Sequence, residues 1–152
     1  MSKFTREVSV SCPPDHVFGV LSNIERLPEF SHLTVAVRNG PGRPLQVGDR
    51  FEQAVKVLGI EFDTEWEVTE VVANTTIRVE GASQHSGKAS LTQNVAPEGT
   101  GSRVTFEVDY DPPFGILGEI ADKVVFERKY EEDAELILAG LKELCEGAPA
   151  AP

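Results

Sequence analysis

The stretch "NIERLPEFSHLTVAVRNG", residues 23–40, joins two kinds of local structure. A short helical segment meets Pro28, where we expect it to end, because proline disfavours the helical conformation of the residue before it. The aromatic Phe30 follows at once, and Leu33, Val35 and Val37 then alternate as in a β-strand. Two interpretations stay open here: the helix and the ring fill a gap in a core, or they line the mouth of a cavity.

The residues on the N-terminal side predict a strand followed by two short helices. Residues 4–10 alternate with a period of two, which indicates a strand. Pro13 and Pro14 suit a helix start, where a missing N–H does no harm. Apolar side chains then recur at helical spacing, and Ser22-Asn23 marks a break and a second N-cap.

The residues on the C-terminal side predict a loop, five further strands and one long helix. Residues 39–49 are rich in Gly and Pro, and between residues 51 and 110 the strand-like runs are separated by turns of Gly, Asn or Ser. Between residues 60 and 68 every second side chain is acidic, so one face of the antiparallel sheet is solvated. From Asp111, a candidate N-cap before Pro112, apolar residues repeat every three or four positions for about 30 residues, or about 45 Å.

Together these elements predict one α+β domain over residues 1–147, with residues 148–152 as a disordered tail. A seven-stranded, curved antiparallel sheet has one apolar face to cover, with two short helices and one long C-terminal helix to cover it. One helix cannot cover the concave face of a curved sheet at every point. We therefore expect an apolar cavity of roughly 300–1,000 Å³ between sheet and helix.

Several segments resemble one known family. They are "VSVSCPPDHVFGVLSNIERLPEFSHLTVAVR" (8–38), "VGDRF" (47–51), "WEVTEV" (66–71), "GILGEIADKVV" (115–125) and "LILAGLKEL" (136–144). This pattern resembles the polyketide cyclase/dehydrase and lipid-transport family, the SRPBCC proteins of the START-like, Bet v 1-like superfamily. The resemblance covers residues 3–146 and implies the helix-grip fold. It also implies a cavity that binds hydrophobic molecules, where only some members do chemistry. The family often has Trp where this chain has Phe30.

The side chains on the inward parity are the expected walls of the cavity, with plain core packing as the alternative for each. The predicted ligand-binding residues are Phe30, Val55, Phe62, Thr64, Trp66, Val79, Leu91, Gln93, Phe106, Val108, Leu117, Ile120, Ala121 and Val124. Thr64 and Gln93 are polar among them. They can pair with each other, with water or with a ligand, because an unpaired buried polar group costs about 1–3 kcal/mol. Gln53 is a similar, more peripheral candidate.

A carrier or sensor of a hydrophobic small molecule needs only such a cavity. A polyketide cyclase or dehydratase would also gain from an acid or base, for which Arg6, Glu70, His32 and Tyr110 are the candidates. A third alternative is an interaction module with a filled core.

The three histidines show no metal-ligand spacing and there is no phosphate-binding glycine motif, so we expect no metal and no cofactor.

The composition of the chain limits its expected binding partners and its expected location in the cell. A formal charge of −11, from 25 acidic and 14 basic residues, argues against nucleic acid and anionic lipid surfaces. No run reaches the ~18 apolar residues of a membrane span and no signal peptide begins the chain, so we expect no membrane insertion and a cytoplasmic protein. Cys12 and Cys145 lack CxxC spacing and are expected to be reduced, half-buried thiols, with a disulfide or a reactive thiol as the alternative. A homodimer through a sheet edge or the acidic helix stays an open alternative.

Overall fold

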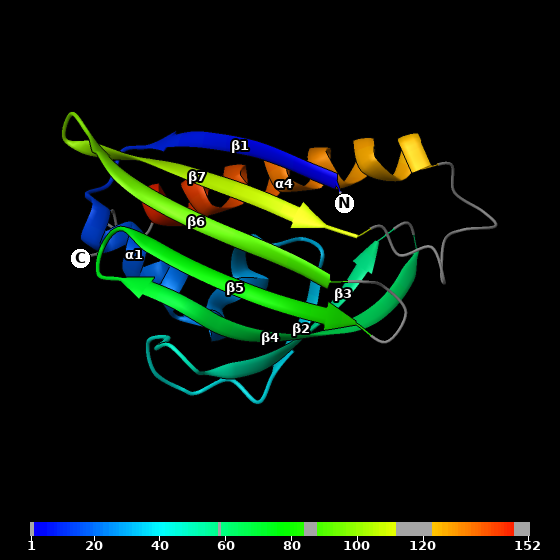
Figure 1. Cartoon of the computed structure of the whole chain (residues 1–152). Coiled ribbons are helices and arrows are strands. Elements are labelled where there is room, and N and C mark those ends of the chain that lie inside the picture. Colours follow the sequence, from blue (N-terminus) through cyan, green and yellow to red (C-terminus); the bar gives the residue numbers. More distant parts are fainter. Residues whose placement is uncertain (1, 58, 84–87, 112–122, 148–152) are drawn as a thin grey trace.

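The computed structural model describes residues 2–57, 59–83, 88–111 and 123–147. Within these ranges, seven strands and three α-helices follow one another in the order that the sequence predicts (Figure 1). The elements are β1 Ser2–Val10, α1 Pro14–Ser22, the 3-10 turn η1 Ile24–Arg26, α2 Leu27–Phe30, β2 Thr34–Arg38, β3 Arg50–Val57, β4 Ile60–Val72, β5 Thr76–Ser83, β6 Lys88–Glu98, β7 Gly101–Tyr110 and α4 Lys123–Gly147.

The strands form one antiparallel sheet in the order β1-β7-β6-β5-β4-β3-β2. The meander from β2 to β7 is confirmed, with β1 added beside β7. Its turns use residues that tolerate a left-handed backbone, such as Asn74 (φ 57°) before β5 and Gly99 (φ 59°) before β7. The acidic parity of β4 is exposed and the opposite parity faces inward, as the alternation predicts.

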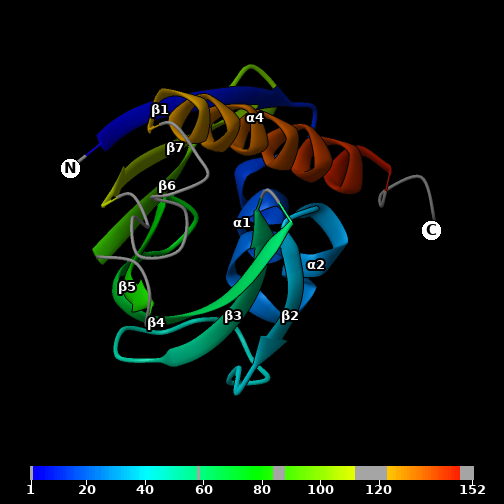
Figure 2. The ribbon, with the colours of Figure 1, turned by 90° about the vertical axis from the view of Figure 1, so that its right-hand side faces the viewer.

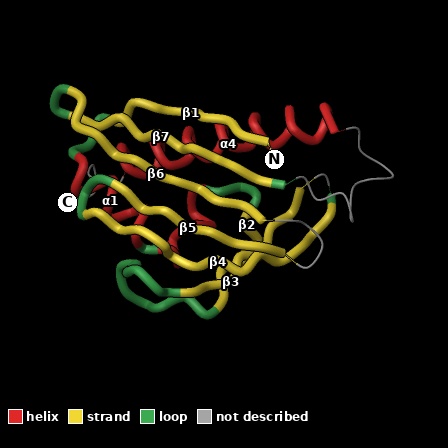
Figure 3. The backbone as a smooth tube through the Cα atoms, in the orientation of Figure 1, coloured by secondary structure: helices red, strands yellow, loops and turns green. Residues whose placement is uncertain are grey.

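The sheet is curved, and the helices lie on its concave side (Figures 2 and 3), where the buried apolar side chains gather. Helix α4 packs along β1 and against α2. Arg6 of β1 pairs with Glu131 and, at 3.5 Å, with Glu135 of α4. At the other end, Glu146 accepts a hydrogen bond from the Ser11 backbone N–H at 2.8 Å. These contacts hold α4 beside the β1 edge of the sheet.

Gly140 lets α2 approach α4 closely. A Cβ at this position would collide with the carbonyl oxygen of Phe30. The close contact directs α2 into the concave side of the sheet, where the Phe30 side chain is buried in the main apolar cluster.

Two local expectations are wrong. Pro28 does not end the second short helix; it occupies the first turn of α2, where its missing N–H has no helical partner to lose. Val35 does not share the inward face with Leu33 and Val37, because the register of β2 against β3 shifts between Thr34 and Ala36. This irregularity turns Val35 to solvent and Thr34 inward.

The expected start of the long helix, at Asp111 and Pro112, lies beside or within residues 112–122, which are outside the described part of the chain. The tail 148–152 lies outside it as well. Within the described residues no helix is long and apolar enough to span a membrane.

Candidate functional site

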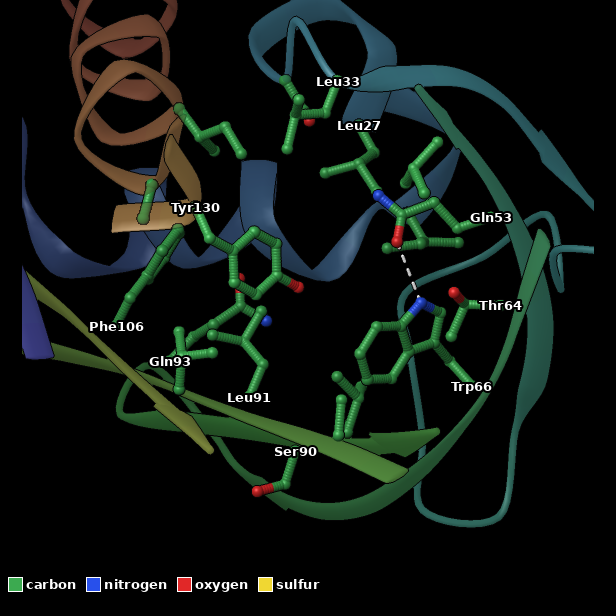
Figure 4. A pocket seen from close by; sticks show the side chains of 18 of the residues that line it. Leu27, Leu33, Gln53, Thr64, Trp66, Ser90, Leu91, Gln93, Phe106 and Tyr130 are labelled. Carbon is green, nitrogen blue, oxygen red and sulfur yellow. Dashed lines mark hydrogen bonds between the residues drawn. The ribbon is translucent and has the colours of Figure 1, made fainter. Parts of the chain in front are cut away.

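A cavity of about 150 Å³ lies between the concave face of the sheet and α4 (Figure 4). Every strand except β2 contributes to its walls, as do η1, α2 and α4. The described lining residues are Phe4, Ile24, Leu27, Phe30, Ser31, Leu33, Leu45, Phe51, Gln53, Val55, Phe62, Thr64, Trp66, Val79, Ala89, Ser90, Leu91, Gln93, Phe106, Val108, Tyr130, Ala134 and Ile137. The volume is below the expected range of 300–1,000 Å³, because large side chains such as Trp66 and Tyr130 fill part of the concave space.

The predicted ligand-binding residues of the sheet, and Phe30 of α2, gather around this cavity. All ten predicted positions from Phe30 to Val108 line it: Phe30, Val55, Phe62, Thr64, Trp66, Val79, Leu91, Gln93, Phe106 and Val108. Leu117, Ile120 and Ala121 lie outside the described residues, and so does the side chain of Val124 in α4. That these residues bind a ligand stays a prediction.

Helix α4 contributes three lining residues that the sequence prediction did not name among the ligand-binding residues. Tyr130, Ala134 and Ile137 of α4 face the cavity, spaced by four and three residues along one side of the helix. They belong to the same apolar repeat that predicted the helix, so the sequence already indicated that these residues lie on the inward side of the helix. What the repeat could not supply was the position along α4 that lies over the cavity.

Trp66 is held in place by a chain of hydrogen bonds that runs along one wall. Its indole Nε1 donates to Gln53 Oε1 at 2.9 Å (Figure 4), and Gln53 Nε2 donates to Thr34 Oγ1 at 2.8 Å. Thr34 Oγ1 donates in turn to Ser31 Oγ at 2.8 Å. An indole N–H only donates, so it fixes the orientation of the Gln53 amide and the direction of the whole chain.

Gly81 supports the other side of the tryptophan. A Cβ at Gly81 would lie 2.6 Å from Cε3 of Trp66, so the indole packs directly over this glycine on the neighbouring strand. Hydrogen bonding on one side and this contact on the other fix Trp66 as a rigid part of the cavity wall.

Thr64 and Gln93 are buried, with exposed fractions of 7% and 9%, and both line the cavity. Neither side chain forms a hydrogen bond with the described residues. They do not pair with each other: Thr64 lies opposite Ser83 of β5 and Gln93 opposite Ile77, six residues apart on that strand. At about 3.3 Å per residue this separates them by about 20 Å along the strand. Gln53, the third polar candidate, is satisfied by Trp66 and Thr34.

A cluster of three aromatic rings lies beside Leu33. Tyr130 meets Tyr110 edge-on with ring centroids 4.6 Å apart, and Phe4 contacts both rings. Burial, with a smaller contribution from the carboxylate of Asp133, raises the pKa of Tyr130 to about 12. Its hydroxyl is therefore protonated at neutral pH and is no general base.

The four candidate acid or base residues do not line the cavity. Arg6 is paired with the acidic residues of α4, and Glu70 is exposed. His32 Nε2 lies 2.9 Å from Oδ1 of Asp133, which also accepts a hydrogen bond from Lys129. Tyr110 is buried in the aromatic cluster.

The cysteines are buried free thiols. Cys12 Sγ donates to the Cys145 carbonyl oxygen at 3.1 Å, and burial raises the pKa of Cys145 to about 11. Among the residues that the structure describes, no three His, Cys, Asp or Glu side chains gather as a metal site would require.

One protein-family model matches almost the whole chain. The family model described as "Polyketide cyclase / dehydrase and lipid transport" matches residues 1–146. No curated protein matches the sequence.

Solved structures match almost the whole chain. The protein TTHA0849 from Thermus thermophilus has a TM-score of 0.75 at 21% identity, covering 97% of this chain and 99% of that one. Ginseng major latex-like protein 151 from Panax ginseng has a TM-score of 0.68 at 12% identity, covering 93% and 95%. The Aha1 dimer from Colwellia psychrerythraea has a TM-score of 0.69 at 14% identity, covering 96% and 97%. These neighbours share the Bet v 1-like helix-grip fold.

Proposed function

Because this chain belongs to the polyketide cyclase/dehydrase and lipid transport family, we propose that it binds a hydrophobic small molecule between the sheet and α4, as a carrier or sensor. The observation that carries the proposal is the cavity itself, whose walls are apolar apart from a few side chains that can form hydrogen bonds. Such walls favour an apolar guest and fix its orientation with a few polar groups. A module with a filled core would leave no such space.

The alternative is an enzyme of the cyclase or dehydratase type. Among the described lining residues, Tyr130 is the one titratable group, and it stays protonated at neutral pH. An enzyme built on these residues would therefore work mainly by positioning its substrate. This observation favours binding over catalysis.

Trp66 makes the proposal directly testable. It is the only tryptophan of the chain and lies in the cavity wall, so its fluorescence reports on the site alone. We expect p-xylene to change the Trp66 emission in a saturable way. Native mass spectrometry of gently purified protein is expected to show a co-purified hydrophobic ligand.

Val79→Phe supplies the decisive variant, because it places a larger side chain inside the cavity. We expect it to fold and to bind p-xylene at least 10-fold more weakly. Val72→Phe, the same exchange at an exposed position of β4, is the matched control and is expected to bind normally. Equal binding by both variants, or no binding by the unmodified protein, would overturn the proposal.

We also propose that residues 1–147 form a single domain and that the protein acts in the cytoplasm. A homodimer is the alternative to a monomer, supported by a dimeric neighbour, the Aha1 protein. Analytical ultracentrifugation distinguishes the two.

A further inference from the structure

Gln93 presents an amide to the cavity that the described residues leave unused. Its side chain is more than nine-tenths buried on β6 and lines the cavity. Its cross-strand neighbours are Ile77 on β5 and Phe106 on β7, and its neighbours along the same face are Leu91 and Val95. All four are apolar and offer no side-chain hydrogen bond.

An amide in such surroundings needs a partner from elsewhere. A buried polar group without one is destabilising, and a leucine or methionine would pack there at no such cost. Thr64 is too far along the sheet to serve, and the cavity-lining hydroxyl groups of Ser31, Ser90 and Tyr130 form no hydrogen bond with Gln93. The Gln53 amide, in contrast, is engaged by two neighbours. The remaining partner is a molecule inside the cavity.

The cavity limits the size and the charge of that molecule. Apolar cavities of about 150 Å³ hold a guest as large as benzene, so the space suits one ring or a chain of similar bulk. No described lining residue carries a charged side chain. A carboxylate or ammonium group would be buried there without a counter-charge, which is strongly unfavourable.

We propose that the ligand is an uncharged molecule of about one ring that presents a hydroxyl, carbonyl or amide group to Gln93. This inference rests on the proposed function and makes it more specific, because it excludes ligands that place a carboxylate or other charged group inside the cavity. The Gln93 amide can donate to the ligand oxygen through its NH₂ group and accept a ligand O–H or N–H through its carbonyl.

Three small probes and two variants test this assignment by calorimetry at pH 7. The probes are p-xylene, p-cresol and p-toluate, which differ only in carrying a methyl, a hydroxyl or a carboxylate group on the same ring. Gln93→Met keeps the side-chain length but removes the amide. Gln46→Met makes the same exchange at an exposed loop position and is the control. Thermal melting confirms that both variants are folded.

We expect the affinity ratio of p-cresol to p-xylene to fall about 3- to 10-fold in Gln93→Met, as the loss of one hydrogen bond implies. The ratio should not change in Gln46→Met, and p-toluate should bind the unmodified protein at least 10-fold more weakly than p-cresol.

The outcomes separate this inference from the proposed function. If p-xylene binds and Val79→Phe prevents it, yet the ratio is the same in Gln93→Met, Gln93 holds water or nothing and this inference is wrong. Binding of p-toluate as tight as that of p-cresol would also overturn it. If no probe binds the unmodified protein, the inference and the proposed function fail together.

Discussion

The hydrogen-bond chain from Trp66 to Ser31 makes a quantitative prediction about Gln53. Replacing Gln53 with leucine keeps the approximate size of the side chain and removes both its acceptor and its donor. The indole N–H of Trp66 then loses its acceptor, and Thr34 loses the N–H that it accepts. Thr34 keeps its bond to Ser31, so the damage is confined to two hydrogen bonds.

The expected cost follows from these two losses. An unpaired N–H in a buried setting costs about 1–3 kcal/mol, and a typical hydrogen bond contributes about 1 kcal/mol net. Both Gln53 and Trp66 are only partly buried, which places the sum near its lower end, at about 2 kcal/mol. For a domain of this size that corresponds to a fall in Tm of about 4–8 °C.

A double-mutant cycle isolates the bond itself. In a Trp66→Phe background there is no indole N–H to leave unpaired, so Gln53→Leu should cost only about 1 kcal/mol. The coupling between the two positions is then about 1 kcal/mol. The free energy of unfolding is measured by urea denaturation followed by circular dichroism, with Gln46→Leu as an exposed control that should change little. Additive effects at the two positions would refute the reasoning.

Two further predictions concern the walls around Trp66 and Tyr130. Gly81→Ala should lower the free energy of unfolding by about 1–3 kcal/mol and shift the Trp66 emission, because the new Cβ collides with the carbonyl oxygen of Glu65 and with the indole. Gly19→Ala, at a helical position with open space around it, should not destabilise the protein, and equal losses in both variants would contradict the argument. The pKa of Tyr130 is raised from 10.0 to about 12, so the folded state keeps a proton that the unfolded state loses. Stability should therefore fall as pH rises from 10 to 12, and less steeply in Tyr130→Phe; parallel pH profiles of the two proteins would count against this.

Much of the fold was predictable because its signals are local. Alternation along β4 follows from the pleat, which puts every second side chain on one face. The acidic residues of β4 indicate which face of the sheet is exposed to solvent. The same alternation located Thr64 and Trp66 on the cavity wall, since a strand that keeps its register keeps its parity.

The failures arose where strand pairing or the preceding element overrode the pattern of the residues themselves. The register shift in β2 depends on its pairing with β3, so the exposure of Val35 has no signature in residues 33–37. Pro28 begins a turn of helix instead of ending one because η1 leads into α2 without a break. To predict the hydrogen bond between Gln53 and Trp66, one would have needed the register of β3 against β4 and the side-chain rotamers. Only the three-dimensional arrangement shows that Gln53 is satisfied and that Gln93 has no partner among the described residues.

The segment of residues 23–40 both fills the core and lines the cavity. Phe30 belongs to the buried apolar cluster and also lines the cavity, since α2 lies against α4 at Gly140 and turns the ring inward. Core packing and cavity wall are therefore not exclusive at this position.

A crystal structure of the protein soaked with p-xylene is the most direct test of ligand binding. The expected result is electron density for one ring enclosed between Trp66, Leu91 and the α4 residues Tyr130 and Ala134, with no such density in Val79→Phe crystals. An interior closed by rearranged side chains, with the probe absent or bound only at the surface, would contradict the account.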